Sequence, residues 1–224
     1  MTPDAPVPTE VARAARLLAA AGLVEGFGHV SARSGATFVI TSTRPLGTMG
    51  PADVAPPGAP GRPLETPLHA AIYRARPDVG AICRTHSPAA VAWGARGEAP
   101  PVVHGLGGLS GEIATGGGCD LVADDASGDA AARELGRADV LLPRANGAVC
   151  TGPDLPSACT RAWFLEERAR VALAAGPAAR PLDAAELSAR ARHYPTETAR
   201  AWQWLAWRFP GADDPTVRTE GETP

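Results

Sequence analysis

The stretch 65–87, ETPLHAAIYRARPDVGAICRTHS, decides the fold because it predicts a helix followed directly by a buried strand. Apolar residues recur at helical spacing in its first half, and the Arg-Pro-Asp triplet at 76–78 ends that helix. The run 79–83 is typical of a short buried strand, and the polar residues after it end at His86. Polar side chains at the end of such a strand are where α/β folds usually carry their chemistry. We therefore expect a site that joins Glu65 to His86.

Working outward from this unit, the same signals predict one α/β domain over residues 1–210, with a helical C-terminal extension and a loose tail over 211–224. Further helices are predicted over 9–21, 87–94, 124–136, 154–175 and 184–209. Strands are predicted over 28–33 and 37–41, which form a hairpin, and over 101–104, 140–142 and a segment ending at Cys150. The stretch 51–63 is expected to be an ordered surface loop, and 105–118 an active-site loop, an interface loop or a plain connection.

Composition and charge exclude several classes of function. The 224 residues carry a formal net charge of −3 without a basic stripe, which argues against nucleic acid as a partner. The chain has 21 basic residues and no lysine, so a lysine Schiff base is excluded. The glycine-rich span 105–118 lacks the spacing of a phosphate-binding loop, and no nucleotide cofactor is expected. The expected partner is a small molecule.

The four cysteines lack the spacing of a disulfide framework or a zinc site. The N-terminus lacks the pattern of a signal peptide, and no apolar run approaches the roughly 20 residues of a membrane span. These patterns predict reduced thiols and a cytoplasmic protein with no membrane association.

Several blocks together resemble the class II aldolase/adducin family, whose members include fuculose phosphate aldolase. They are the sequence GHVSAR at 28–33, Glu65 with His69 and Tyr73, the Arg-Pro-Asp triplet at 76–78, the strand to His86, and the segment 141–147. The resemblance implies a three-layer αβα fold in which helices flank a central, mostly antiparallel sheet. It also implies a homo-tetramer with active sites near subunit interfaces.

The family's aldolases hold a divalent metal, usually zinc, with three histidines, while an acidic residue handles the proton. By this resemblance Glu65 is the catalytic carboxylate and His86 is one ligand histidine. Arg84 and Asn146 stand where the other two ligand histidines are expected. An arginine cannot lose its proton to bind zinc, so we expect the metal (Zn, Fe or Mn) to be absent or its site altered. The substitute ligand set to consider is His86, His104 and Asn146.

The segments that hold the sugar phosphate in these aldolases are also changed. Arginines at positions 33, 44, 62 and 84 suit a substrate carboxylate, because a guanidinium pairs with it through two hydrogen bonds. The candidate substrate-binding residues are His29, Ser31, Arg33, Thr43, Arg44, His104 and Tyr194. Asn146-Gly147 is also the signal of a type I′ hairpin turn, and a turn and a site role can coexist.

The leading hypothesis is a carbon–carbon lyase that acts on a small oxo or hydroxy carboxylic acid through an enol-type intermediate, by aldol cleavage or decarboxylation. Glu65 would shuttle the proton, His86 would stabilise the oxyanion and Arg84 would orient the carboxylate. A non-catalytic assembly or ligand-binding module of the adducin kind is the first alternative, because it also fits the lost histidines. An iron-dependent oxygenase on the same fold is the second.

Overall fold

The computed structural model describes residues 7–210 and contains a seven-stranded sheet in the order β3-β2-β1-β4-β7-β6-β5. The pairings are antiparallel except for β5 with β6, which is parallel. The strands are β1 (His29–Ser34), β2 (Thr37–Thr41), β3 (Val54–Ala55), β4 (Ala81–Thr85), β5 (Ile113–Gly116), β6 (Val140–Pro143) and β7 (Ala148–Gly152). The predicted hairpin of β1 and β2 is confirmed.

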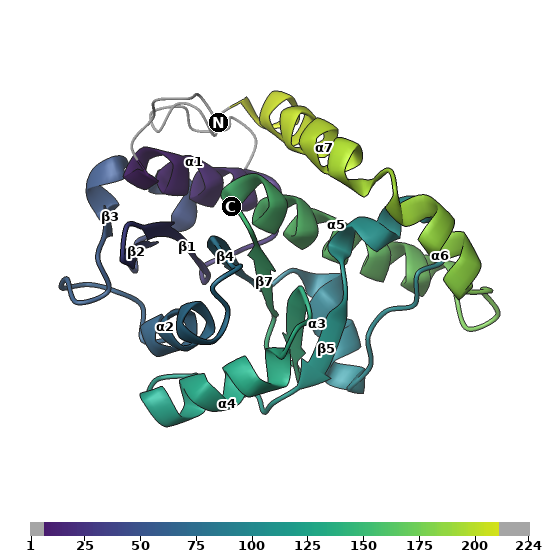
Figure 1. Cartoon of the computed structure of the whole chain (residues 1–224), viewed down its shortest axis with the longest axis horizontal. Helices are drawn as coiled ribbons and strands as arrows, with labels where there is room; N and C mark the ends of the chain where they lie inside the picture. The colour runs from purple at the N-terminus through teal and green to yellow at the C-terminus, as the bar shows by residue number, and fades with distance from the viewer. Residues whose placement is uncertain (1–6, 211–224) are drawn as a thin grey trace, which may run out of the picture.

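Helices cover both faces of this sheet, which confirms the three-layer prediction (Figure 1). One face packs against α1 (Val7–Ala20), α3 (Pro88–Arg96) and α5 (Leu155–Ala175). The other packs against α2 (Thr66–Ala75) and α4 (Asp125–Leu135). Among residues 7–210, no helix is long and apolar enough to cross a membrane.

Alternation along the strands sends His29 and Ser31 of β1 and Arg84 of β4 to the α2 face. On β4, Ala81 and Cys83 join the core beside α1 and α5, whereas Ile82 joins the core beside α2. Because successive side chains on a strand point to opposite faces, Arg84 follows Ile82 to the α2 side. His29 lies opposite Arg84 in the β1–β4 ladder and shares that side. The start of α2 therefore meets both strands.

The predicted strand at 101–104 is wrong, because its backbone has no sheet partner. Pro100 and Pro101 have no N–H to donate to a ladder. The Pro100 carbonyl accepts a hydrogen bond from Arg168 instead, and the Val102 carbonyl accepts one from the amide of Leu182. The segment is an extended connection, fastened by contacts with distant residues.

Two segments predicted as single units are divided in the structure. The glycine-rich span 105–118 contains a 3₁₀ helix, η3 (Gly105–Ser110), and the parallel edge strand β5. The predicted helix 184–209 is two helices, α6 (Ala184–Ala191) and α7 (Tyr194–Arg208), because Pro195 starts a new first turn. The loop predicted at 51–63 contains a short 3₁₀ helix, η2 (Pro51–Asp53), and β3, and η1 (Leu46–Thr48) precedes it. The tail predicted over 211–224 lies outside the described residues.

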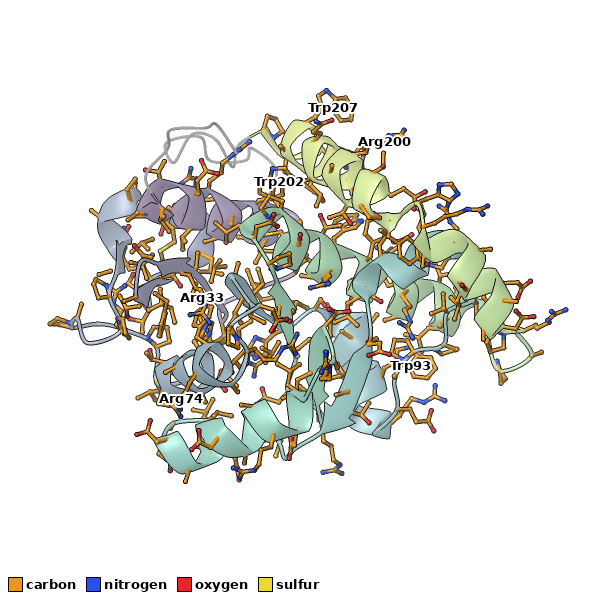
Figure 2. All side chains as sticks on the ribbon, viewed as in Figure 1. Arg33, Arg74, Trp93, Arg200, Trp202 and Trp207 are labelled. Carbon is orange, nitrogen blue, oxygen red and sulfur yellow. The ribbon has the colours of Figure 1, made fainter. Side chains whose placement is uncertain are left out.

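The tryptophans of α7 spread around the helix, as the sequence predicts. Trp202 is buried and lies under the guanidinium of Arg13 in α1. Trp204 packs edge-on against Trp163 of α5, with ring centroids 5.3 Å apart. Trp207 is 75% exposed and points away from the rest of the chain (Figure 2). Helix α7 is thus held to the domain by two of its three tryptophans.

Candidate active site

Two adjoining cavities lie where β4 ends, and both are lined by Glu65, Leu121 and Asn146. The outer cavity, about 480 Å³, is also lined by residues of the predicted site: His29, Thr43, Arg44 and His86. The inner cavity, about 190 Å³, adds Arg84 and the loop residues Gly117, Gly118, Asp120 and Val122. We call the two together the Glu65 cleft. The structure therefore brings most of the predicted site residues into one place.

Glu65 lies at the N-cap of α2 and is buried, with 6% of its surface exposed. Its Oε2 accepts hydrogen bonds from His29 Nε2 at 3.2 Å and from Arg84 Nε at 3.1 Å. Its Oε1 accepts one from the amide of Val122 at 3.3 Å. The carboxylate is therefore held from three sides, by β1, by β4 and by the loop that covers the inner cavity.

These contacts fix the charge of Glu65. Burial raises the pKa of Glu65, but the hydrogen bond from His29, the charge of Arg84 and the amide of Val122 outweigh burial and lower that pKa to about 2. Glu65 is therefore ionised at neutral pH, so its oxygens only accept hydrogen bonds in the free protein. An acid in the first turn of a helix interacts favourably with the helix dipole without any buried hydrogen-bond partner, so the three partners of Glu65 indicate more than that role.

Arg84 is the largest fully buried side chain of the described residues, with 1% exposure. Its Nε donates to Glu65 and its Nη1 donates to the backbone carbonyl of Thr85 at 3.1 Å. Burial lowers the pKa of Arg84 and Glu65 opposes that shift, yet a guanidinium keeps its charge at neutral pH. The cleft thus contains one buried, oriented cation beside an ionised carboxylate.

His86 and Asn146 complete the cleft. Burial and the charge of Arg84 lower the pKa of His86, so its imidazole is neutral at pH 7. The Nδ1 of His86 is buried without a hydrogen-bond partner among the described residues. Asn146 donates from Nδ2 to the carbonyl of Cys119 at 3.1 Å and so ties the covering loop to the β6–β7 connection. His86 therefore contributes a neutral imidazole to the lining of the outer cavity.

Thr43 and Arg44 stand at the outer end of the cleft. The Arg44 side chain is 61% exposed and pairs with Asp53 at 3.0 Å. It is the second arginine of the cleft, after Arg84, and it lies at the solvent side. A ligand with two acidic groups would meet one guanidinium at each end.

Ser31 and Arg33, which the sequence predicts to bind substrate, do not line the Glu65 cleft. Ser31 is fully buried behind His29 and is bonded to His69 and Tyr73 rather than open to the cleft. The Arg33 guanidinium lies next to α2 (Figure 2) and donates hydrogen bonds to three backbone carbonyls, those of Val79, Tyr73 and Arg76. The Arg62 guanidinium likewise donates hydrogen bonds to the backbone carbonyls of Ile40 and Asp53.

His104 and Tyr194 lie outside the Glu65 cleft. His104 lines a separate pocket with Trp163 and Trp204, and its Nε2 is buried without a partner among the described residues. Tyr194 packs on Gly108 and its hydroxyl approaches the Gly105 carbonyl at 3.4 Å. Within one chain they do not join His86, so a substrate or metal role for either would need another route to the cleft.

The residues of the cleft do not fit the family's metal. Among residues 7–210, no group of three or more histidine, cysteine, aspartate or glutamate side chains is placed to hold a metal ion. Of the substitute set predicted from the sequence, His86 and Asn146 share the cleft but His104 does not. Arg84 adds a fixed positive charge at the place of a ligand histidine, which disfavours a cation there.

Sequence reasoning groups His69 and Tyr73 with Glu65, but it missed the contact that the loop 117–122 makes with Glu65. His69 and Tyr73 lie four and eight residues after Glu65, so helical spacing alone places all three on one face of α2. That signal was available. The approach of Val122 to Glu65 was not, because it joins positions 57 residues apart in the sequence.

The β6–β7 connection is not the type I′ turn expected from Asn146-Gly147. Positive φ angles occur at Ala145 (54°) and Gly147 (66°), but not at Asn146. A Cβ on Gly147 would overlap the Thr85 carbonyl oxygen and lie 2.5 Å from Arg84 Nη1. Gly147 therefore allows the turn to approach the end of β4 and the buried guanidinium.

Gly147→Ala is expected to destabilise the protein by about 2–4 kcal/mol, since it adds an overlap to the cost of a positive φ. Gly97→Ala is the matched control, because Gly97 has φ 69° and nothing within 4 Å of an added Cβ. That control is expected to cost only about 1 kcal/mol. Urea unfolding followed by circular dichroism measures both values, and equal losses for the two variants would contradict the packing described here.

The fold and the cleft define a class II aldolase-like lyase, and the comparisons with known proteins agree. Residues 9–173 match the family model described as the class II aldolase and adducin N-terminal domain. The chain therefore belongs to the class II aldolase/adducin family, as the sequence predicts. The expectation of a lyase of this type is confirmed as well.

Two curated relatives share one activity. A 3,4-dihydroxyphthalate decarboxylase of Terrabacter sp. (strain DBF63) is 31% identical over 206 residues, which covers 80% of this chain and 86% of the relative. A second enzyme of that name, from Rhodococcus jostii (strain RHA1), is 29% identical over 189 residues, 73% of this chain and 78% of the relative. The L-fuculose 1-phosphate aldolase of Glaciozyma antarctica PI12 has a similar structure, with a TM-score of 0.75 at 19% identity over 90% of this chain and 89% of its own.

Proposed function

We propose that the protein is a decarboxylase of hydroxylated carboxylic acids that uses Arg84, rather than a divalent metal, as its buried cation. The observation that carries this proposal is the Arg84–Glu65 pair: a fully buried guanidinium held by an ionised carboxylate inside the cleft. The decarboxylase relatives support a carboxylate substrate over a phosphosugar. The two arginines of the cleft support a substrate with two acidic groups, and 3,4-dihydroxyphthalate is the first to test.

Decarboxylation needs a place for the electron pair that the departing CO2 leaves behind. On an aromatic ring the carbon that bears the carboxylate is protonated first, because only then does the carbon–carboxylate bond overlap the π system. When that bond breaks, its electron pair moves through the ring onto an oxygen as an enolate-type anion. A positive charge fixed near that oxygen stabilises the transition state without reorganising during the reaction. Arg84 supplies such a charge, because Glu65 and the Thr85 carbonyl orient it.

The second requirement is a proton on the carbon that loses CO2. Glu65 is ionised in the free protein and takes a proton from a substrate hydroxyl, which raises the electron density of the ring or enol. It then gives that proton to the carbon that bears the substrate carboxylate, before CO2 leaves. The oxygen that receives the electron pair takes one proton from solvent, so one proton in all replaces one CO2 and the Glu65 carboxylate is regenerated. The neutral imidazole of His86 lines the outer cavity and would hydrogen-bond the substrate oxygen on that side.

The rim of the cleft supports the homo-tetramer expected from the resemblance. Phe27, Leu64 and Leu121 line the cleft and are 80%, 70% and 57% exposed. Exposed apolar side chains gathered around a site are typical of a surface that a partner covers. Light scattering on the purified protein is expected to give a mass four times that of one chain, and a monomer would contradict this part of the proposal.

The function is tested by incubating the purified full-length protein with 3,4-dihydroxyphthalate and measuring CO2 release and the aromatic product by chromatography. Stoichiometric release of one CO2 per substrate is expected. The matched comparison is phthalate, which lacks the hydroxyl that Glu65 would deprotonate and is expected to be inert. L-Fuculose 1-phosphate is expected to give no cleavage. Turnover of the phosphosugar without turnover of any hydroxylated aromatic acid would contradict the proposal.

A further inference from the structure

A continuous series of buried hydrogen bonds leads from the cleft into the protein core. It runs from Glu65 through His29, His69 and Ser31 to Tyr73, and we call it the buried histidine network. The distances between successive partners are 3.2, 2.7, 2.6 and 2.9 Å. Every side chain in it is at least nine-tenths buried, and three of the five, Ser31, His69 and Tyr73, do not line the cleft.

The charge of Glu65 fixes the direction of each hydrogen bond. Because Glu65 is ionised it only accepts, so His29 must carry its proton on Nε2. Burial lowers the pKa of His29, so the ring is neutral and its Nδ1 is an acceptor. That nitrogen lies 2.7 Å from Nε2 of His69, which must therefore be the donor.

The same reasoning continues into the core. Burial lowers the pKa of His69 well below its ordinary value, so His69 is neutral and its Nδ1 accepts from the Ser31 hydroxyl at 2.6 Å. The Ser31 oxygen in turn accepts from the Tyr73 hydroxyl at 2.9 Å. All donors in the network thus point toward Glu65, and both histidines have one allowed tautomer.

The inner end of the network is closed. Tyr73 packs between Phe38, with centroids 4.9 Å apart, and the guanidinium of Arg33 at 4.8 Å from its ring. Burial raises the pKa of Tyr73, so its hydroxyl does not give up a proton to the others. Among the described residues its oxygen has no hydrogen-bond partner besides Ser31. The network therefore orients groups and does not carry protons through the core.

We propose that the buried histidine network makes His29 a positioning residue for Glu65. It fixes His29 as an Nε2–H donor, so the carboxylate stays oriented and ionised and exchanges protons only on the cleft side. The charged or titratable groups that face Glu65 are His29 from β1, Arg84 and His86 from β4 and its end, and His69 from α2. The expected effect on catalysis rests on the proposed function, whereas the expected tautomers of His29 and His69 do not.

The tautomers are tested first, on the full-length protein without substrate. With ¹⁵N-labelled histidine, two-bond ¹⁵N–¹H spectra distinguish Nε2–H, Nδ1–H and doubly protonated rings among the five histidines. His29→Asn and His69→Asn assign the two signals of interest. Both rings are expected to be neutral Nε2–H tautomers at pH 7. A His29 ring protonated on Nδ1, or on both nitrogens, would overturn the proposal whether or not the protein is a decarboxylase.

The coupling to Glu65 is tested with Ser31→Ala, which removes a hydroxyl of the network that does not touch the cleft. Weaker donation from His29 raises the pKa of Glu65, so the acid limb of kcat/KM is expected to move up by about half to one pH unit, with KM unchanged. Thr160→Val is the matched control, because it removes an equally buried hydroxyl, on α5, outside the network. An acid limb that moves no further than in this control would overturn the proposal.

A second variant and a direct measurement of the Glu65 pKa complete the test. Tyr73→Phe keeps the ring and removes only the terminal donor, and it is expected to shift the acid limb in the same direction by a smaller amount. It replaces Ser31→Ala if that variant does not fold. If the protein turns over no substrate, the pKa of Glu65 is read from its ¹³C carboxylate signal, and the same upward shift is expected. A pKa that is unchanged in these variants contradicts the network's role.

Discussion

Arg84→Lys is expected to lower kcat/KM for decarboxylation by about 10²- to 10³-fold, the usual cost of removing one oriented donor to a developing oxyanion. Lysine keeps a positive charge, but it cannot hold the planar orientation that Nε and Nη1 give Arg84 through Glu65 and Thr85. The loss should fall mainly on kcat, because the charge is needed most in the transition state. Initial rates at saturating substrate measure kcat, and initial rates at limiting substrate measure kcat/KM.

Arg74→Lys is the matched control for this variant. Arg74 pairs with Asp129 on the exposed side of α2, outside the Glu65 cleft, and its replacement is expected to leave turnover unchanged. Arg84→His adds a second comparison, since it restores the histidine that the family's metal site has there. If Arg84→Lys keeps full activity, or if Arg84→His is active without added metal, Arg84 is not the cation of the reaction.

Glu65→Gln is expected to abolish most turnover, by about 10²- to 10⁴-fold, while substrate binding is largely kept. Glutamine preserves the size of the side chain and one acceptor oxygen for Arg84, but it cannot take a proton from substrate. Glu98→Gln is the control, because Glu98 pairs with Arg96 on the surface. Unchanged turnover in Glu65→Gln would remove Glu65 from the chemistry.

The same variant has a signature in stability. The folded-state pKa of Glu65, about 2, lies below the ordinary value of 4.5, so its ionisation stabilises the fold above pH 4.5. That contribution is lost as the pH falls from 4.5 toward 2. The difference in unfolding free energy between wild type and Glu65→Gln should therefore be constant above pH 4.5 and shrink below it. Chemical unfolding at several pH values measures this, and a difference independent of pH would contradict it.

Much of the fold was accessible from the sequence because local signals agreed with one another. The helix beginning after Glu65, the Arg-Pro-Asp stop and the short buried strand after it each follow from periodicity and turn chemistry. The structure has all three, with the strand at Ala81–Thr85 rather than at the predicted 79–83. The errors fall where distant contacts decide the local structure. The segment 101–104 has no strand partner: the Val102 carbonyl accepts from the amide of Leu182, and the Pro100 carbonyl just before the segment accepts from Arg168.

The site divides in the same way. Glu65, Arg84 and His86 were candidates because the resemblance implies roles for these positions, at the start of one helix and the end of one strand, and the structure brings them into one cleft. Ser31 and Arg33 were assigned to substrate because residue type alone cannot show which partners a side chain meets. Arg33 donates hydrogen bonds to backbone carbonyls at the end of α2, and Ser31 lies beneath His29. Such satisfaction of hydrogen bonds depends on tertiary packing, which one sequence does not reveal.

The most direct test of the central claim is the activity of the protein after its metal content has been removed. Full-length protein is dialysed against EDTA, checked by elemental analysis, and assayed with 3,4-dihydroxyphthalate, with the buffer itself freed of metal. With Arg84 as the cation, the rate should equal that of untreated protein, and added Zn²⁺, Mn²⁺ or Fe²⁺ should not increase it. Loss of turnover on dialysis, with recovery when one of these ions is returned, would contradict the account.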